Sequence, residues 1–369
     1  MKYLFFYCFS ILFLFSVSSC IRSEAPNAEA DIISCKVISP AGVKDDVSIS
    51  GKYVTILVDS VVEHTALGIE FQLTPGATIS PASGTVRDFT NPQNYTVTSE
   101  DGKWKKTYTV NVTSVVSIPK KFSFENAKVS DEYEGFTYYT FYELNDLDTL
   151  RIWDSGNSGF ALMSYGESPD AYPTVSYPEG KVGKCLKLET LSTGKLGAMF
   201  KKPIAAGNLF LGRFNGDNAV LEPLKATEFG AALGFWPTKM TGYYKYKAGP
   251  VVTDAKGAVV GGTDTFDIYS IIFEKEPNRP YLDGSNSLTS DQLIAIARMP
   301  QKSKKETDKW TKFSLPFVIQ PGKVFDEKKL LRNEYSISIV FSSSIDGADF
   351  RGAIGSTLFI DEINLLTEE

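Results

Sequence analysis

The chain has 369 residues, of which 43% are apolar and 13% aromatic, and its formal net charge is −6. This length suits two domains, and the acidic balance argues against nucleic-acid partners because there is no basic field to hold phosphates. One histidine and a few scattered cysteines argue against a histidine-based relay, a zinc cluster and a disulfide framework. Short alternating stretches rich in Gly, Thr, Ser and Tyr predict an all-β protein.

The chain begins with "MKYLFFYCFSILFLFSVSSC", in which a lysine precedes an apolar run over residues 3–17. That run is shorter than the roughly 20 residues needed to cross a bilayer, so residues 1–19 are predicted to be a secretory signal. Its end resembles the lipobox of bacterial lipoproteins, which implies cleavage before Cys20 and lipid attachment there. The alternative is a secreted protein in which Cys20 is incidental. Cys35 and Cys185 then remain as isolated thiols, each expected to be a small buried side chain.

The first domain follows a polar segment, residues 20–30, that is suited to a tether. Residues 31–113 contain alternating strand patterns such as "GIEFQLTP" and "TYTVNVT", and a hairpin is expected to close near Asp101 and Gly102. These patterns predict an immunoglobulin-like sandwich. The stretch over residues 77–110 resembles immunoglobulin-like modules at the front of Bacteroidetes surface lipoproteins, which implies a spacer or contact module.

A second and larger domain is expected after Pro119, which stops strand pairing. Residues 120–369 contain about eight strand patterns, among them "KCLKLET", "DTFDIYSIIFE", "YSISIVFSS" and "STLFIDEINLL", separated by turn residues. So many strands over this length predict a jelly-roll β-sandwich.

Several segments of this second domain resemble one family, the putative carbohydrate metabolism domain (PCMD) of Bacteroidales lipoproteins. The resemblance rests on "IWDSGNSGF", "GKCLKLET", "FGAALGFWPTKMTGYYKYKAG", "DTFDIYSIIFE" and "YSISIVFSSSIDGADFRGAIGSTLFIDEINL". It implies a jelly roll like that of carbohydrate-binding modules and a role in handling glycans.

The segment "GYYKYKAG" is the first candidate ligand surface. In a strand, Tyr243, Lys245 and Lys247 share one face, while Tyr244 and Tyr246 share the other and are expected to pack inward. A tyrosine beside two lysines could stack on a sugar ring and hydrogen-bond its hydroxyls. The same pattern is also that of the solvated face of an antiparallel sheet, and both interpretations stay open.

A second candidate is "RIWDSGNSGF", where Trp153 leads into a predicted tight loop beside Asp154 and Asn157. An indole with amide and carboxylate neighbours suits saccharide contacts. In the alternative, Trp153 fills the core and the polar side chains satisfy backbone groups. Trp236 has the same two interpretations, with a stronger expectation of burial.

A glycosidase would need two carboxylates about 5 Å, or about 6.5 to 9.5 Å, apart. Asp267 and Glu274 lie in one predicted strand with opposite parity and about 23 Å apart, so they cannot form such a pair. Glu189, on the same strand face as Lys187, and Asp264 could approach other acids only through the fold.

Glu125 in "FSFENA" and Asp361 in "LFIDEINLL" resemble the positions at which carbohydrate-binding jelly rolls hold a structural calcium. Calcium needs six to eight oxygen ligands, so two acids at a sheet edge is the simpler interpretation. No other cofactor is expected.

Three hypotheses for function follow from the sequence. The first is a lipoprotein of the cell envelope, in the outer membrane, that binds glycan through its C-terminal jelly roll without cleaving it. The second is a carboxylate-based glycoside hydrolase or lyase. The third is a structural or adhesion component with no sugar site and with protein partners in the envelope.

Overall fold

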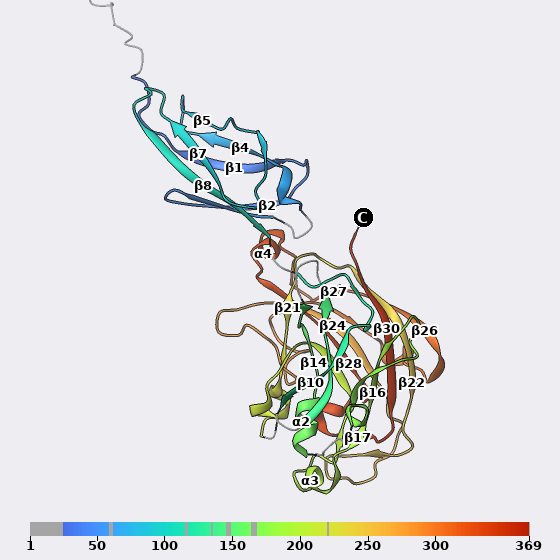
Figure 1. Ribbon diagram of the computed structural model, residues 1–369. Helices are drawn as coiled ribbons and strands as arrows, with labels where there is room; N and C mark the ends of the chain where they lie inside the picture. Colours follow the sequence, from blue (N-terminus) through green and yellow to red (C-terminus); the bar gives the residue numbers. More distant parts are fainter. Residues whose placement is uncertain are drawn as a thin grey trace, which may run out of the picture. The chain divides into compact units, whose positions relative to one another are not determined.

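The computed structural model describes residues 25–58, 62–114, 117–133, 136–144, 149–163, 168–219 and 221–368. The predicted signal, residues 1–19, and the predicted lipidation site, Cys20, lie outside the described residues. The predicted all-β class is confirmed (Figure 1). In the described part of the chain, no helix is both long and apolar enough to cross a membrane.

The chain forms two compact units whose main division lies between residues 112 and 113. The N-terminal unit contains a three-stranded sheet in the order β1-β4-β6 and a five-stranded sheet in the order β2-β3-β8-β7-β5. Their bounds are β1 Ile32–Ser39, β2 Asp45–Ser50, β3 Tyr53–Val58, β4 Leu67–Leu73, β5 Thr78–Ser80, β6 Val86–Arg87, β7 Gln93–Thr98 and β8 Lys105–Ser114. The predicted hairpin is present: β7 and β8 pair with Tyr95 opposite Tyr108, and both rings are buried.

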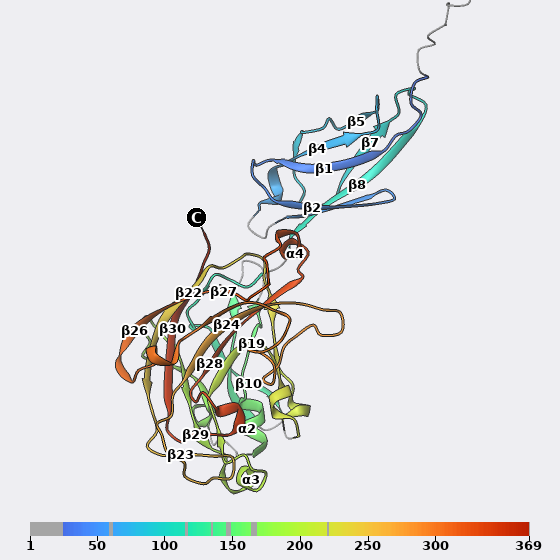
Figure 2. The ribbon, with the colours of Figure 1, turned by 180° about the vertical axis from the view of Figure 1, so that it is seen from behind.

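The C-terminal unit is a sandwich of two large antiparallel sheets (Figure 2). The eight-stranded sheet has the order β14-β19-β28-β24-β25-β27, with β20 beside β19 and β21 beside β28. Its bounds are β14 Trp153–Asp154, β19 Asn208–Phe214, β20 Thr227–Phe229, β21 Ala231–Ala232, β24 Asp267–Glu274, β25 Leu293–Arg298, β27 Val318–Ile319 and β28 Tyr335–Ser342.

The six-stranded sheet has the order β15-β16-β30-β22-β26, with β9 beside β30. Its bounds are β9 Lys121–Phe122, β15 Thr174–Tyr177, β16 Cys185–Glu189, β22 Lys239–Lys247, β26 Thr307–Pro316 and β30 Thr357–Leu366. Short ladders join β10 Ala127–Tyr133 to β11 Phe136–Phe141, β12 Glu143–Leu144 to β13 Thr149–Leu150, β17 Leu191–Ser192 to β18 Ile204–Ala205, and β23 Val252–Thr253 to β29 Gly352–Ala353. The α-helices among the described residues are short: α2 Asn157–Met163, α3 Gly194–Met199 and α4 Glu327–Leu331.

The main core lies between the two sheets, and strand parity decides which side chains enter it. In β22, Tyr244 and Tyr246 are each only 3% exposed and pack on Phe266, with ring centroids 4.9 and 4.7 Å apart. Tyr243 and Lys245, on the other face, are partly exposed. The predicted alternation of this strand is therefore confirmed.

One local prediction is wrong. The segment after Trp153 is not simply a tight loop, because helix α2 begins at Asn157. The turn at Ser155 and Gly156 is closed by side-chain acceptors, since Asp154 accepts the Ser155 N–H and Asn208 accepts the Gly156 N–H. Contacts with β19, far along the chain, thus support the start of this helix.

Candidate functional site

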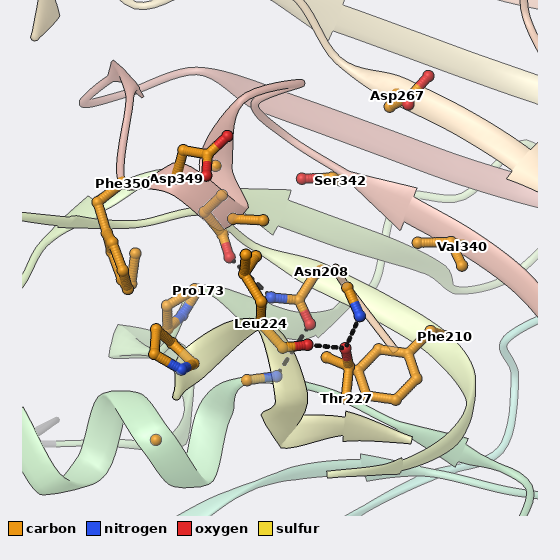
Figure 3. A pocket seen from close by; sticks show the side chains of 18 of the residues that line it. Pro173, Asn208, Phe210, Leu224, Thr227, Asp267, Val340, Ser342, Asp349 and Phe350 are labelled. Carbon is orange, nitrogen blue, oxygen red and sulfur yellow. Dashed lines mark hydrogen bonds between the residues drawn. The ribbon is translucent and has the colours of Figure 1, made fainter. Parts of the chain in front are cut away.

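A cavity of about 510 Å³ lies over the outer face of the eight-stranded sheet, the face turned away from the six-stranded sheet (Figure 3). Leu209, Ile268 and Phe341 point into the main core, whereas Phe210 and Tyr269 belong to a separate apolar cluster outside it. The alternation of side chains along β19, β24 and β28 therefore gives this sheet a second buried face, and the cavity opens above it.

The cavity floor consists of two rows of cross-strand neighbours. The polar row comprises Asn208, Ser342 and Asp267, since Ser342 of β28 pairs with both of the others. The next row is mainly apolar and comprises Phe210, Val340, Tyr269 and Arg298. Phe210, Tyr269 and Asp267 are buried beneath this floor. The surface that a ligand can reach comes from less buried lining residues, which include the polar side chains of Ser342, Arg298 and Asp349 and the rings of Phe214 and Phe350.

Buried aromatic rings are packed beneath this floor. Phe210 meets Phe229 edge to face, with ring centroids 5.1 Å apart. The hydroxyl of Tyr269 lies 3.3 Å from that of Ser287, and burial raises the pKa of Tyr269 to about 12. Tyr269 is therefore a neutral phenol at physiological pH, and the guanidinium of Arg298 lies 5.8 Å from its ring centroid.

Loops that wall the cavity are tied together by main-chain hydrogen bonds. Gly284 N–H donates to the carbonyl of Leu224 at 2.8 Å and to Oγ1 of Thr227 at 3.1 Å. Figure 3 shows Oγ1 of Thr227 donating to that same carbonyl, at 3.3 Å. The N–H of Phe229 donates to the carbonyl of Leu282 at 2.7 Å. These bonds join Leu224 and β20 to the segment between β24 and β25, so the protein's own hydrogen bonds hold these walls together.

The charged groups of the cavity include an ion cluster at Asp267, which is 4% exposed. One of its oxygens, Oδ2, accepts from Nη2 of Arg298 at 2.6 Å, and the other, Oδ1, accepts from Nζ of Lys304 at 2.8 Å. Burial lowers the pKa of Lys304. A second carboxylate, Asp349, lines the cavity and is exposed. In the view of Figure 3, Ser342 lies between Asp349 and Asp267.

Trp153 lies in the main core rather than on a ligand surface, which contradicts its predicted sugar contact. The indole is 6% exposed and packs against Phe122, Phe124 and Phe341. Its Nε1–H donates to Oε1 of Glu143 at 2.9 Å. No face of the ring is left for a sugar.

Glu143 gives the stability of the C-terminal unit an unusual pH dependence, because burial raises its pKa from 4.5 to about 7. The folded state then binds the proton more tightly than the unfolded state, so this group's contribution to stability falls as pH rises from about 4.5 to 7. Gln keeps the acceptor for Trp153 and cannot ionise. We expect Glu143→Gln to raise the free energy of unfolding by about 2 to 3 kcal/mol at pH 8 and to leave it nearly unchanged at pH 4.5.

Urea denaturation at both pH values measures this difference. The exposed Glu179→Gln is a matched control and should leave the free energy of unfolding unchanged at either pH. A gain from Glu143→Gln that is equal at pH 4.5 and pH 8 would contradict the assignment.

The polar neighbours predicted to join Trp153 in binding instead hold the backbone. Asp154 Oδ2 accepts the N–H of Phe214 at 2.7 Å. Asn157 is fully buried and makes two hydrogen bonds with the backbone of Thr174, at 2.8 and 3.1 Å. Asp154 and Asn157 therefore fit the alternative interpretation, in which their side chains satisfy backbone groups.

Trp236 packs against the edge of the main core and is only partly buried. Its ring stacks on Phe325 with centroids 4.3 Å apart and meets Tyr335 edge to face at 6.0 Å. One face of the indole is thus already covered, and Trp236 does not line the cavity.

Tyr243, Lys245 and Lys247 lie on the outer face of the other, six-stranded sheet. The ammonium of Lys181 lies 4.4 Å from the ring centroid of Tyr243. That of Lys245 lies 4.7 Å from the centroids of both Trp310 and Phe359. Lysine ammonium groups already lie over the aromatic rings of this strand face, which reduces the ring surface available for stacking on a sugar.

Glu125 and Asp361 do come close to one segment, but their oxygens accept N–H groups. Asp361 Oδ2 accepts from the backbone of Lys181 at 2.7 Å and Val182 at 3.1 Å, and Glu125 accepts from the backbone of Lys184. Donor hydrogens at these oxygens disfavour a cation, so the predicted calcium site is not supported. The described residues contain no group of three or more His, Cys, Asp or Glu side chains placed to hold a metal ion.

The other predicted carboxylates are also in structural contacts. Glu189 pairs with Lys187 at 2.7 Å, in keeping with their shared strand face. Asp264 is buried, and its Oδ2 accepts from Ser344, Ser356 and the N–H of Ala353 at 2.6 to 2.8 Å. Neither lines the cavity.

The sequence interpretation did not single out several residues of the cavity. They are Asn208, Phe210, Val340, Ser342 and Asp349. A signal was present in "NLFLGRF" and "YSISIVFSS". On each of the two faces of these predicted strands there are residues that suit either burial or contact with a ligand. The strand order that brings these segments together was not visible.

The fold and site define a two-unit all-β protein with a ligand-sized cavity over one face of its C-terminal sandwich. The chain belongs to the family described as "Putative carbohydrate metabolism domain", whose model matches residues 123–366. A second model, described as "SGBP, N-terminal", matches residues 32–112. These matches confirm the predicted family.

Two crystal structures from Bacteroides are similar over long stretches. One, from Bacteroides thetaiotaomicron VPI-5482, is described as a putative glycoside hydrolase; it is 46% identical, and the match covers 94% of this chain and 99% of that chain with a TM-score of 0.65. The other, from Bacteroides vulgatus ATCC 8482, bears the same description; it is 42% identical and covers 69% of this chain and 100% of that chain, with a TM-score of 0.65. No curated protein matches the chain.

Proposed function

We propose that this protein binds a glycan in the cavity of its C-terminal unit and does not cleave it. The observation that carries the proposal is the accessible lining of this cavity, in which the polar side chains of Ser342, Arg298 and Asp349 stand with the rings of Phe214 and Phe350. Sugars present apolar C–H faces and a rim of hydroxyl groups, and this lining offers a partner for each. A volume of about 510 Å³ suits a small-molecule or oligosaccharide segment. The family's description as a carbohydrate metabolism domain supports the same substrate class.

The strand face that carries Tyr243, Lys245 and Lys247 is the second candidate surface for the glycan. The rings of this face are already in contact with lysine ammonium groups. The face is also not part of the cavity. Tyr243→Ala should therefore leave glycan affinity within about twofold. A loss of tenfold or more would place the glycan on this face instead.

Cleavage of the glycan is the rival function, since Asp267 and Asp349 line the same cavity and both solved relatives are described as putative glycoside hydrolases. Both oxygens of Asp267 accept hydrogen bonds from Arg298 and Lys304. This carboxylate therefore has no unengaged oxygen with which to protonate a glycosidic bond. That geometry favours binding over hydrolysis.

A glycan array probed with the purified protein tests the proposal, followed by incubation with each hit and chromatography of the products. We expect hits that are recovered intact. Release of shorter saccharides would establish the hydrolase instead. No hit from a folded protein would favour a structural or adhesion role with envelope protein partners.

The location that fits this function is the cell envelope, with a lipid on Cys20 that holds the protein at the outer membrane. The sequence before Cys20 and the "SGBP, N-terminal" match support export. We expect labelled fatty acid to enter the wild-type protein expressed in a Bacteroides host and not Cys20→Ala, as measured by gel autoradiography. Label in the Cys20→Ala protein would contradict attachment at this residue.

A further inference from the structure

The ion cluster at the Asp267 end of the cavity contains more cations than anions. Asp267 meets Arg298 through Nε and Nη2, at 3.1 and 2.6 Å from Oδ2, and meets Lys304 at 2.8 Å. The side chain of Lys304 is 2% exposed and that of Asp267 is 6% exposed, whereas that of Arg298 is 38% exposed. One carboxylate therefore faces two cations in a largely buried site.

Neighbouring acids do not remove this excess. Asp346, whose charge favours protonated Lys304, is exposed and pairs with Arg351 at 3.4 Å. Asp349 is exposed, and Figure 3 shows it across Ser342 from Asp267. A buried excess charge is costly unless a counter-charge accompanies it, and the lowered pKa of Lys304 has burial as its main cause.

Arg298 also keeps a donor for a ligand. Its Nε and Nη2 are held by Asp267, while Nη1 makes no hydrogen bond within the described part of the chain. The side chain lines the cavity and lies over Tyr269. A guanidinium fixed on one edge by a carboxylate is preorganised to bind a second oxyanion on the other edge.

We propose that the glycan bound here is acidic, and that a carboxylate or sulfate group on it pairs with Arg298. This inference rests on the proposed function and names its substrate class. Lys304 does not line the cavity. The role of Lys304 is to place a second positive charge at Asp267, so that this one carboxylate does not neutralise Arg298 completely.

The first experiment is a panel of neutral, uronate-containing and sulfated oligosaccharides probed with the full chain. We expect the hits to be uronate-containing or sulfated, and comparison of these two arms identifies the oxyanion. Hits among neutral saccharides alone would overturn this inference and leave glycan binding intact. An absence of hits in every arm would overturn the proposed function itself.

Variants then test Arg298 with the strongest acidic hit and with the same saccharide neutralised by carboxyl reduction or desulfation. Arg298→Gln should lower affinity for the acidic form at least tenfold and for the neutral form by less than twofold. Arg298→Lys, which keeps the charge, should recover part of the loss. Lys304→Met should reduce the ratio of the affinity for the acidic form to that for the neutral form several-fold, although Lys304 does not contact the ligand.

Salt dependence provides a readout that a purely structural role would not change. The wild-type affinity for the acidic form should fall as salt is raised from 50 to 500 mM, and that of Arg298→Gln should change much less. Thermal melts check that each variant is folded. Equal losses for the acidic and neutral forms would show that Arg298 only supports the cavity wall, and would overturn the inference.

Discussion

Tyr244→Ala is expected to lower the free energy of unfolding of the C-terminal unit by about 3 to 5 kcal/mol, the range for truncation of a large buried aromatic ring. Tyr244 is 3% exposed, and its ring packs on Phe266 and Phe313 with centroids 4.9 and 6.4 Å apart. Removal of the ring leaves a void between the two sheets that their backbones cannot close. Tyr243→Ala, one residue earlier, should cost about 1 kcal/mol, since it loses mainly a partly exposed ring and its contact with Lys181.

Urea denaturation followed by tryptophan fluorescence measures both changes. Trp153, Trp236 and Trp310 belong to the C-terminal unit and Trp104 to the N-terminal one, so the signal reports mainly the sandwich that contains β22. Tyr244→Phe keeps the ring and is the matched control, with an expected loss of about 1 kcal/mol or less. Equal destabilisation by Tyr243→Ala and Tyr244→Ala would mean that the strand is buried on both faces.

The alternation of β22 could be predicted because it depends only on neighbours along the chain. Two lysines beside Tyr243 require water or a polar partner, so the set containing Tyr244 and Tyr246 had to be the buried one. The hairpin near Asp101 and Gly102 was predictable for the same reason. Local pattern also sufficed for the all-β class.

The roles of Trp153 and Asn157 could not be predicted, because their partners are distant in sequence. Asn157 is held by the backbone of Thr174, and the indole packs on Phe122 and Phe341. An aromatic side chain beside Asp and Asn has the same local pattern whether it faces a sugar or fills a core. Only the tertiary contacts distinguish the two.

The cavity itself depends on strand order, which no local pattern reveals. Asn208, Ser342 and Asp267 form one polar row only because β28 lies between β19 and β24. The walls come from segments near Leu224 and Gly284 that hydrogen-bond to each other. The alternation of side chains along each strand was visible in the sequence, but the identity of the strand that pairs with it was not.

If the cavity binds the glycan, a substitution that fills it should lower affinity strongly. Ala348 lines the cavity in a short 3-10 helix, Gly347–Asp349, and its side chain is exposed. A tryptophan there can project into the opening without displacing a core residue. We expect Ala348→Trp to lower glycan affinity at least tenfold, which is about 1.4 kcal/mol or more, and to leave the melting temperature nearly unchanged.

The matched control is Ala258→Trp, which adds the same ring at an exposed position that does not line the cavity. Calorimetric titration of the strongest array hit into the wild type, Ala348→Trp and Ala258→Trp is the most direct measurement. We expect a loss of affinity of at least tenfold for Ala348→Trp alone. Wild-type affinity in a folded Ala348→Trp protein would contradict it, because the glycan would then have to bind elsewhere.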